Sequence, residues 1–271
     1  MVKKIDVDKN KCIKCGLCIK DCITSCIEFG IDQIPQYRKD GENSCIECQH
    51  CMAICPAGAL SFGDKKPENS TKTSYANSDE LLNLIKSRRS IRQYKKTDIP
   101  AEAVGKIIDM LPYVPTGVNI DDLHFSIVET KAKMDKIRDY TYKTILEETN
   151  PEKLGMMAMF TDAIKGGNDI IFRGATGMIV VAVDKSKAAQ SCVNVDPVIA
   201  LSYVDLYAQS LGLGTLWCGI ATEVFKNFPE ILAKLEIPEN YTIAYVMILG
   251  VPAVKYARTI QPDDISIKGL R

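Results

Sequence analysis

The chain has 271 residues, of which 46% are hydrophobic, so it can fill an ordinary globular core in one large domain or two moderate ones. Its 34 Lys and Arg residues balance 34 Asp and Glu residues, which leaves no charge excess that would direct it to nucleic acid, an anionic membrane or an acidic substrate. The N-terminus has no apolar core of signal-peptide length, and the apolar runs are too short to span a bilayer, so we expect a cytoplasmic protein.

Nine of the eleven cysteines precede residue 56. Eight of these nine form two runs of the pattern C-x2-C-x2-C-x3-C, and every cysteine of the second run follows its counterpart by 33 residues. The constant offset indicates an internal duplication. The runs are Cys12, Cys15, Cys18 and Cys22, then Cys45, Cys48, Cys51 and Cys55.

This spacing predicts two [4Fe-4S] clusters. The short spacers wrap three thiolates around one corner of a cubane, and in two-cluster ferredoxins the fourth cysteine of a run ligates the other cluster. Structural zinc sites are the alternative, but they normally close with four ligands and do not need a third cysteine two residues further on. We therefore expect one cluster on Cys12, Cys15, Cys18 and Cys55, and the second on Cys45, Cys48, Cys51 and Cys22.

Residues 1–62 resemble the bacterial two-[4Fe-4S] ferredoxin domain, and the run from Cys55 through Pro56 to Leu60 fits that family. Cys26 stands where the second copy has Ala59, so we interpret it as a packed thiol. His50 lies between two cluster cysteines, and we expect it to tune hydrogen bonding without ligating iron.

Residues 63–77 read as a polar linker, because they lack apolar periodicity. The second domain, residues 78–271, is predicted to begin with a helix that Asn77 caps and that ends near Arg88. Another helix should follow Pro100. The predicted apolar positions of the two helices are Leu81, Leu82, Leu84 and Ile85, then Val104, Ile107, Ile108 and Leu111.

Further elements alternate between strand and helix. Asp196 followed by Pro197 predicts an N-cap and the first helical position of a helix that runs through Gln209 and is terminated by Gly212. Helices interleaved with strands indicate a sheet flanked by helices, in the α+β or α/β range. The other predicted elements are strands over 124–128, 178–183, 215–218 and 241–249, and a helix over 131–148.

The segment Arg88-Arg89-Ser90-Ile91-Arg92 places three guanidinium groups and a hydroxyl within five residues. Guanidinium groups bind phosphate and carboxylate bidentately, so the segment is a candidate anion site. A solvated basic helix end explains the same five residues equally well.

Four motifs together resemble the FMN-dependent nitroreductase family over roughly residues 80 to 262. They are residues 88–92 (RRSIR), 115–119 (PTGVN), 212–219 (GLGTLWCG), and 250–252 (GVP) followed by 255–258 (KYAR). The resemblance implies an α+β fold overall, with a nitroreductase-like α+β sandwich after the small ferredoxin-like domain. It also implies a homodimer, because the flavin sites of the family are built from both subunits.

The same resemblance implies the residues that hold FMN. Arg88, Arg89, Ser90 and Arg92 would bind the phosphate and ribityl chain, and Lys255 and Arg258 would close the phosphate site. Pro115, Thr116, Gly117 and Asn119 would form the loop contributed across the dimer interface. The backbone at Cys218 and Gly219 would lie beside flavin N5. Cys218 itself is expected to be packed, since no histidine neighbours it in sequence.

Cluster and flavin modules in one chain predict an oxidoreductase that relays electrons from an external donor through two clusters to FMN and a small-molecule acceptor. Nitroaromatics, quinones and enones all suit such a flavin. The possible external donors are NAD(P)H and reduced ferredoxin. Direct reduction of FMN by NAD(P)H, with the clusters peripheral, is the first alternative. A redox sensor or electron carrier without a dedicated substrate is the second.

Overall fold

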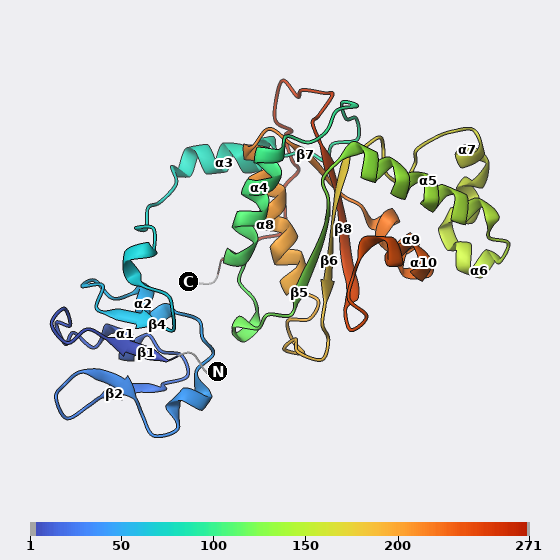
Figure 1. Ribbon diagram of the computed structural model, residues 1–271. Helices are drawn as coiled ribbons and strands as arrows, with labels where there is room; N and C mark the ends of the chain where they lie inside the picture. Colours follow the sequence, from blue (N-terminus) through green and yellow to red (C-terminus); the bar gives the residue numbers. More distant parts are fainter. Residues whose placement is uncertain (1–3, 270–271) are drawn as a thin grey trace. The chain divides into compact units, whose positions relative to one another are not determined.

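Contacts between residues divide the computed structural model, which describes residues 4–269, into two units (Figure 1). Unit 1 consists of Met1–Tyr75 and Val118–Ile120. Unit 2 consists of Ala76–Gly117 and Asp121–Arg271. Among the described residues, the helices are too short or too polar for any of them to cross a bilayer.

Unit 1 repeats its backbone at the same interval as its cysteines. Its two short helices, α1 (Leu17–Lys20) and α2 (His50–Ala53), begin and end 33 residues apart. Left-handed backbone positions repeat likewise, in the pairs Lys14 and Glu47, Gly16 and Gln49, and Ser25 and Gly58. The duplication is therefore one of conformation as well as of sequence. The remaining elements are β1 (Ile5–Val7), β2 (Ile27–Phe29), β3 (Pro35–Tyr37), η1 (Gly41–Ser44) and β4 (Leu60–Phe62), with β1 paired to β4 and β2 to β3, both antiparallel.

The predicted linker is ordered in part. Phe62 and Lys65 exchange backbone hydrogen bonds of 3.1 and 3.0 Å, which close a tight turn at its start. A short 3-10 helix, η2 (Pro67–Asn69), follows, and the Glu68 carboxylate lies 2.7 Å from Lys11 Nζ. A local turn and an ion pair thus order a segment that buries little apolar surface.

Unit 2 is built on a four-stranded antiparallel sheet of order β5-β6-β8-β7. All seven residues of β6 are buried, which confirms the predicted buried strand. Met178 and Val180 enter one hydrophobic core, whereas Ile179 and Val181 enter the other, as the two-residue period of a strand requires. The strands are β5 (Leu123–Val128), β6 (Gly177–Val183), β7 (Gly214–Trp217) and β8 (Thr242–Gly250).

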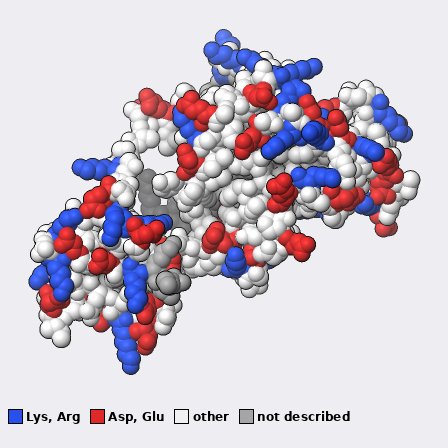
Figure 2. Space-filling view, in the orientation of Figure 1, with Lys and Arg blue, Asp and Glu red and all other residues white. Residues whose placement is uncertain are grey.

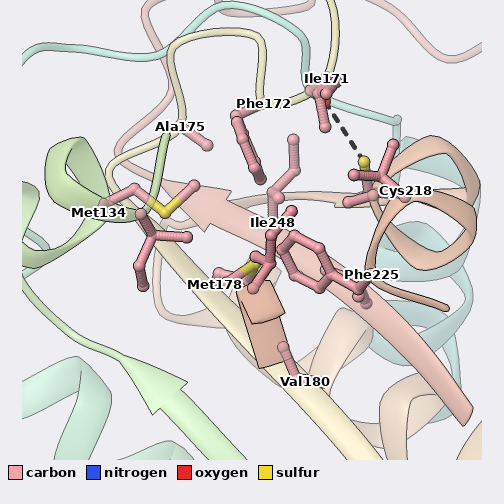
Figure 3. Packing of buried hydrophobic residues seen from close by; sticks show 14 of the residues in the cluster. Met134, Ile171, Phe172, Ala175, Met178, Val180, Cys218, Phe225 and Ile248 are labelled. Carbon is pink, nitrogen blue, oxygen red and sulfur yellow. Dashed lines mark hydrogen bonds between the residues drawn. The ribbon is translucent and has the colours of Figure 1, made fainter. Parts of the chain in front are cut away.

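Helices cover both faces of this sheet (Figure 1). α4 (Ala101–Met110) and α8 (Asp196–Ser210) share the core of Ile179. α5 (Lys131–Glu147) and α9 (Gly219–Asn227) share the core of Met178, which Figure 3 shows from close by. The unit is therefore α+β. The other helices are α3 (Ser78–Ser87), η3 (Leu111–Tyr113), η4 (Gly117–Asn119), α6 (Pro151–Leu154), η5 (Gly155–Phe160), α7 (Thr161–Lys165), α10 (Pro229–Leu232) and η6 (Ala233–Leu235).

The predicted helix after Asn77 is confirmed as α3, and the Asn77 side chain accepts hydrogen bonds from the backbone N–H groups of Asp79 and Glu80 at 2.9 and 3.1 Å. On its apolar face, Leu81, Leu82 and Ile85 are 45%, 46% and 49% exposed. No residue of α3 is buried. In α4, Val104 and Ile107 point inward as expected, but the inward placement of Ile108 is wrong, since it is 42% exposed.

Asp196 does not cap α8. The N-cap is Val195, and Asp196 occupies the first turn with its Oδ2 2.8 Å from the backbone N of Gly117. Its carboxylate is buried and satisfies a loop amide in place of a helix amide. Gly212 ends the helix with a left-handed φ of 77°, as predicted.

Two glycines in unit 2 should respond oppositely to replacement by alanine. A Cβ at Gly177 would lie 2.3 Å from Ile99 Cδ1 and 2.8 Å from the Val128 carbonyl oxygen, so Gly177→Ala should lower the free energy of unfolding by about 1–3 kcal/mol. Gly105 lies within α4 with no atom within 4 Å of its added Cβ, so Gly105→Ala should raise it by about 0.5–1 kcal/mol. Trp217 is the only tryptophan, so its fluorescence in urea reports on this unit. If both variants changed the free energy of unfolding in the same direction, the packing described at these two glycines would be contradicted.

Candidate functional site

Two cavities in unit 1 are each lined by four of the eight paired cysteines. In both, three thiols come from one run and the fourth comes from the other run. The spacing assigned the same groups of four cysteines to the two clusters, and that ligand assignment stays a prediction. The first cavity contains Cys12, Cys15, Cys18 and Cys55, and the second contains Cys22, Cys45, Cys48 and Cys51.

The backbone around the cavities alternates between left-handed and right-handed residues. Gly16 precedes α1 with φ 72°, and Gln49 precedes α2 with φ 60°, and both are followed by helical residues. Successive N–H groups in such turns point into one concavity, an arrangement that binds anions and iron-sulfur clusters. Among residues 4–269, no three His, Cys, Asp or Glu side chains come together closely enough to hold a single metal ion.

Cys26, which belongs to neither run of the repeat, also lines the second cavity. It is 1% exposed, and its Sγ is 3.4 Å from that of Cys22. Burial raises the pKa of Cys26 to about 11, which fits a packed, protonated thiol. At the equivalent place in the first cavity, the Ala59 backbone N–H donates to Cys55 Sγ at 3.3 Å. His50 Nδ1 pairs with Asp21 Oδ2 at 3.2 Å.

In unit 2, the basic segment 88–92 is hydrogen-bonded to the sheet. The Ile91 N–H donates to the Thr215 carbonyl at 2.8 Å, which fixes the segment against β7. Just beyond it, the Lys95 N–H donates to the Val251 carbonyl at 2.8 Å, and the Ala253 N–H donates to the Gln93 carbonyl at 3.0 Å. Segments more than 120 residues apart in the sequence therefore meet at one end of β7 and β8.

Glycines permit this close approach. A Cβ at Gly214 would lie 2.6 Å from Ile91, and a Cβ at Gly250 would lie 3.0 Å from the Tyr94 ring and from Thr176 Oγ1. A larger residue at either position would push segment 90–95 away from the sheet. The glycine motifs recognised in the sequence thus have a packing role.

A cavity of about 200 Å³ lies at this junction, and Arg89 and Lys255 both line it. Arg89 Nη2 donates to the Lys86 carbonyl at 2.6 Å, which holds its guanidinium near the end of α3. Gln209 Nε2 donates to Ser87 Oγ at 3.1 Å on the same wall. Two cations and adjacent hydroxyl and amide groups make the cavity suited to a phosphate.

Arg88 is placed differently from Arg89. Its Nη1 lies 3.5 Å from Oδ2 of Asp205, whose side chain is only 7% exposed. Asp205 also accepts hydrogen bonds from Thr215 Oγ1 and from Trp217 Nε1, the latter at 3.1 Å. Arg88 therefore neutralises a buried carboxylate and does not line the cavity. An aspartate within a helix carries no sequence signal for such a role.

The other predicted phosphate residues surround the junction without lining its cavity. Ser90 forms a bridge to Thr215. Arg92 is exposed, and its Nη1 is 3.4 Å from the Ser90 carbonyl. Arg258 is also exposed.

The predicted loop 115–119 is shared between the two units. Pro115 is exposed, Thr116 is half-buried, and Gly117 packs so closely that a Cβ would lie 2.5 Å from Cys192 Sγ. Asn119 falls in unit 1, where its Nδ2 donates to the Ile46 carbonyl at 3.0 Å.

Cys218 and Gly219 form the start of α9. The Cys218 thiol is 4% exposed and donates to the Ile171 carbonyl at 3.3 Å (Figure 3). Burial raises the pKa of Cys218, so the thiol stays protonated near neutral pH, as expected of a packed residue. A Cβ at Gly219 would meet Tyr245 Oη at 3.3 Å.

Asp169 was missed by the sequence analysis. Its carboxylate accepts hydrogen bonds from Tyr142 Oη at 2.5 Å, from the Phe172 N–H at 2.9 Å and from the Gly174 N–H at 2.7 Å. Arg138 Nε lies 2.9 Å from it. These bonds hold the loop that carries the Ile171 carbonyl to Cys218.

Comparisons with known proteins identify the larger unit. The sequence matches the nitroreductase family over residues 85–251. A protein of Methanothermobacter thermautotrophicus, provisionally named NADH dehydrogenase/NAD(P)H nitroreductase, is 31% identical over 181 residues, which are 64% of this chain and 78% of that protein. The FMN reductase [NAD(P)H] of Bacillus subtilis is 26% identical over 185 residues, 66% of this chain and 68% of that enzyme.

Solved structures share the fold. A nitroreductase with bound FMN from Desulfitobacterium hafniense aligns with a TM-score of 0.57 at 23% identity, covering 73% of this chain and all of that one. A nitroreductase with bound FMN from Bacteroides fragilis aligns with a TM-score of 0.54 at 22% identity, covering 72% and 100% of the two chains.

Proposed function

The chain belongs to the nitroreductase family of FMN-dependent oxidoreductases, and from this premise we propose that two [4Fe-4S] clusters in unit 1 supply electrons to FMN held by unit 2. The electrons then reduce an electron-poor small molecule of the nitroaromatic, quinone or enone type. The observation that carries the proposal is the pair of four-cysteine cavities in a chain whose other unit is a nitroreductase.

The residues of unit 1 fit two cubane clusters. Each cavity offers four thiols, and the repeated left-handed turns are of the kind whose backbone N–H groups bind iron-sulfur clusters. We assign Cys12, Cys15, Cys18 and Cys55 to one cluster and Cys22, Cys45, Cys48 and Cys51 to the other. Such clusters transfer single electrons when bound.

The residues of unit 2 fit the phosphate of FMN. Arg89 and Lys255 would bind it directly in the cavity of about 200 Å³, and Ser90, Arg92 and Arg258 would approach it from the exposed side. Arg88 would act on the site through Asp205, which it neutralises. The backbone at Cys218 and Gly219, and Pro115, Thr116, Gly117 and Asn119, remain our proposal for contacts near the flavin ring.

A second candidate is direct reduction of FMN by NAD(P)H, with the clusters peripheral. The names of the relatives from Methanothermobacter thermautotrophicus and Bacillus subtilis favour it, because both include NAD(P)H. The two candidates differ in whether loss of a cluster stops reduction of the flavin.

Replacing Arg89 or Lys255 should weaken the binding of FMN, because each side chain is proposed to contact the FMN phosphate. Arg89→Gln and Lys255→Gln should each raise the Kd for FMN about tenfold, since a charge-assisted hydrogen bond of that kind contributes about 1.4 kcal/mol. Quenching of flavin fluorescence measures the Kd. Lys96→Gln, an exposed cation in the same unit, is the control and should leave the Kd unchanged. Riboflavin lacks the phosphate, so an equal loss of riboflavin affinity would contradict the assignment.

Replacing one ligand cysteine should disable the relay. Cys48→Ser should remove about half of the iron and sulfide of the anaerobic protein, because each cluster holds four irons. It should also abolish cluster-dependent reduction of FMN while dithionite-reduced FMN stays reactive with the acceptor. Cys26→Ala is the matched control, since Cys26 is a packed thiol beside the same cavity. Zinc in place of iron would refute the clusters, and unchanged electron transfer in Cys48→Ser would favour direct reduction by NAD(P)H.

A homodimer is proposed from the exposed apolar surface of unit 2. Leu81, Leu82 and Ile85 of α3 are 45%, 46% and 49% exposed, and Val198 and Tyr203 of α8 are 44% and 45% exposed. α3 packs against α8, so these side chains lie on neighbouring elements. Exposed apolar side chains on neighbouring elements are typical of an interface.

Leu82→Glu should convert the dimer to a monomer, because it places a charge within that apolar surface. Light scattering measures the mass, and Lys86→Gln, on the same helix, is the control because it makes the same one-unit change in net charge. A wild-type monomer with full FMN occupancy would overturn the proposed dimer.

A further inference from the structure

The two four-cysteine cavities of unit 1 differ in the side chains that stand at equivalent positions of the repeat. At the offset of 33 residues, Thr24 corresponds to Ala57. Cys26 corresponds in the same way to Ala59. Thr24 and Cys26 line the second cavity, and Ala59 lines the first. A hydroxyl and a thiol can donate hydrogen bonds and a methyl group cannot, so the two cavities offer their four cysteines different surroundings.

Both of these donors lie next to the sulfur of Cys22. Thr24 Oγ1 is 3.6 Å from Cys22 Sγ, and Cys26 Sγ is 3.4 Å from it. A thiolate bound to iron carries no proton, so in a loaded site the hydroxyl and the thiol must be the donors of these two bonds. The Cys26 side chain is only 1% exposed, so water does not compete for its proton.

The backbone makes the same contact in both copies of the repeat. In the first cavity, the Ala59 N–H donates to Cys55 Sγ at 3.3 Å. In the second cavity, the backbone of Cys26 hydrogen-bonds to Cys22, which is the counterpart of Cys55. The difference between the two sulfurs is therefore confined to the side-chain donors.

A third donor also serves the second cavity. In the strand pair β2–β3, Ile27 is the partner of Tyr37. Leu60, 33 residues after Ile27, is the partner of Val7 in the pair β1–β4, so Tyr37 and Val7 are equivalent. Burial and a hydrogen bond to the Cys45 side chain raise the pKa of the Tyr37 hydroxyl. Cys45 lines the second cavity, whereas Val7 lines the first and has no group to donate.

Hydrogen bonds to the sulfur atoms of an iron-sulfur cluster are one of the factors that set its reduction potential. An added electron increases the negative charge on the sulfurs, so a donor stabilises the reduced form more than the oxidised form. The side chains of Thr24, Cys26 and Tyr37 therefore favour reduction at the second cavity.

Charge and solvent act in the opposite direction. Lys14 in the first copy and Glu47 in the second stand at equivalent positions between ligand cysteines, and Cys15 of the first cavity is exposed. Lys14 is exposed and Glu47 is half-buried, so water and salt screen both charges. Figure 2 shows Lys and Arg side chains interspersed with Asp and Glu side chains on the face of unit 1 that it draws. The hydrogen bonds, in contrast, act directly on the ligand sulfurs.

We propose that Thr24, Cys26 and Tyr37 give the second cavity the higher reduction potential, so that an electron taken up by unit 1 rests there before it passes to FMN. This inference rests on the proposed function, because it requires a [4Fe-4S] cluster in each cavity. It gives the relay a direction, from the first cavity to the second, and a role to three residues that are not ligands.

The test is a redox titration of the anaerobic full-length protein, followed by electron paramagnetic resonance of the reduced clusters. The wild type should show two midpoint potentials that differ by at least about 59 mV, which is a tenfold preference for one site in a one-electron couple. Cys48→Ser should lose the higher midpoint and keep the lower one, because Cys48 lines the second cavity.

The double variant Thr24→Ala, Cys26→Ala gives the second cavity the residues of the first. It should keep the iron of both clusters, since neither side chain is a ligand, and lower only the higher midpoint, by about tenfold in the preference or about 59 mV. Tyr37→Phe should lower the same midpoint. A merely structural role for these side chains would leave both midpoints where they are.

The reciprocal variant Ala57→Thr, Ala59→Cys is the matched control, because it places the same two donors in the first cavity. It should raise only the lower midpoint, and it decides the question alone if the other double variant loses a cluster. A shift of the wrong midpoint, or no shift, would overturn the inference. A wild type without iron and sulfide would refute the proposed function as well, whereas two clusters with equal midpoints would refute this inference only.

Discussion

The seating of residues 90–95 between β7 and the segment after β8 is the constraint on which the larger unit depends. One backbone hydrogen bond joins Ile91 to Thr215, and Lys95 is bonded to Val251. The contact is tight enough that Gly214 admits no side chain. Because of it, Arg89 near the start of the unit and Lys255 near its end line one cavity, although neither lies on the sheet.

Three carboxylates, two of them buried and one half-buried, organise loop segments of the larger unit. Asp205 orients Arg88 and Trp217, Asp169 shapes the loop that meets Cys218, and Asp196 holds Gly117. Asp205 and Asp169 each accept two or more hydrogen bonds, and Asp196 accepts one from the Gly117 N–H. These bonds offset the cost of removing the carboxylates from water. These three carboxylates therefore act on the conformation of loops.

Features with a strict period were predictable from the sequence. The cysteine repeat, the buried strand β6 and the capped helix α3 each carry a local signal, and each is present where expected. A local sequence signal does not show which distant residue or element a side chain contacts. The apolar residues of α3 were expected to face a core, but Leu81, Leu82 and Ile85 are exposed. The role of Asp196 depends on Gly117, 79 residues away.

Each cavity contains the fourth cysteine of the other run, so the two copies of the repeat constrain each other's evolution. A single 33-residue copy could complete such a cavity only by associating with a second identical chain. The extent of that association would depend on the concentration of the chain. Fusion into one chain makes the association intramolecular and raises the effective concentration of the missing thiol. Each copy can then diverge elsewhere, as Lys14 and Glu47 do at equivalent positions with opposite charge, but neither can lose its exchanged cysteine without opening the other's cavity.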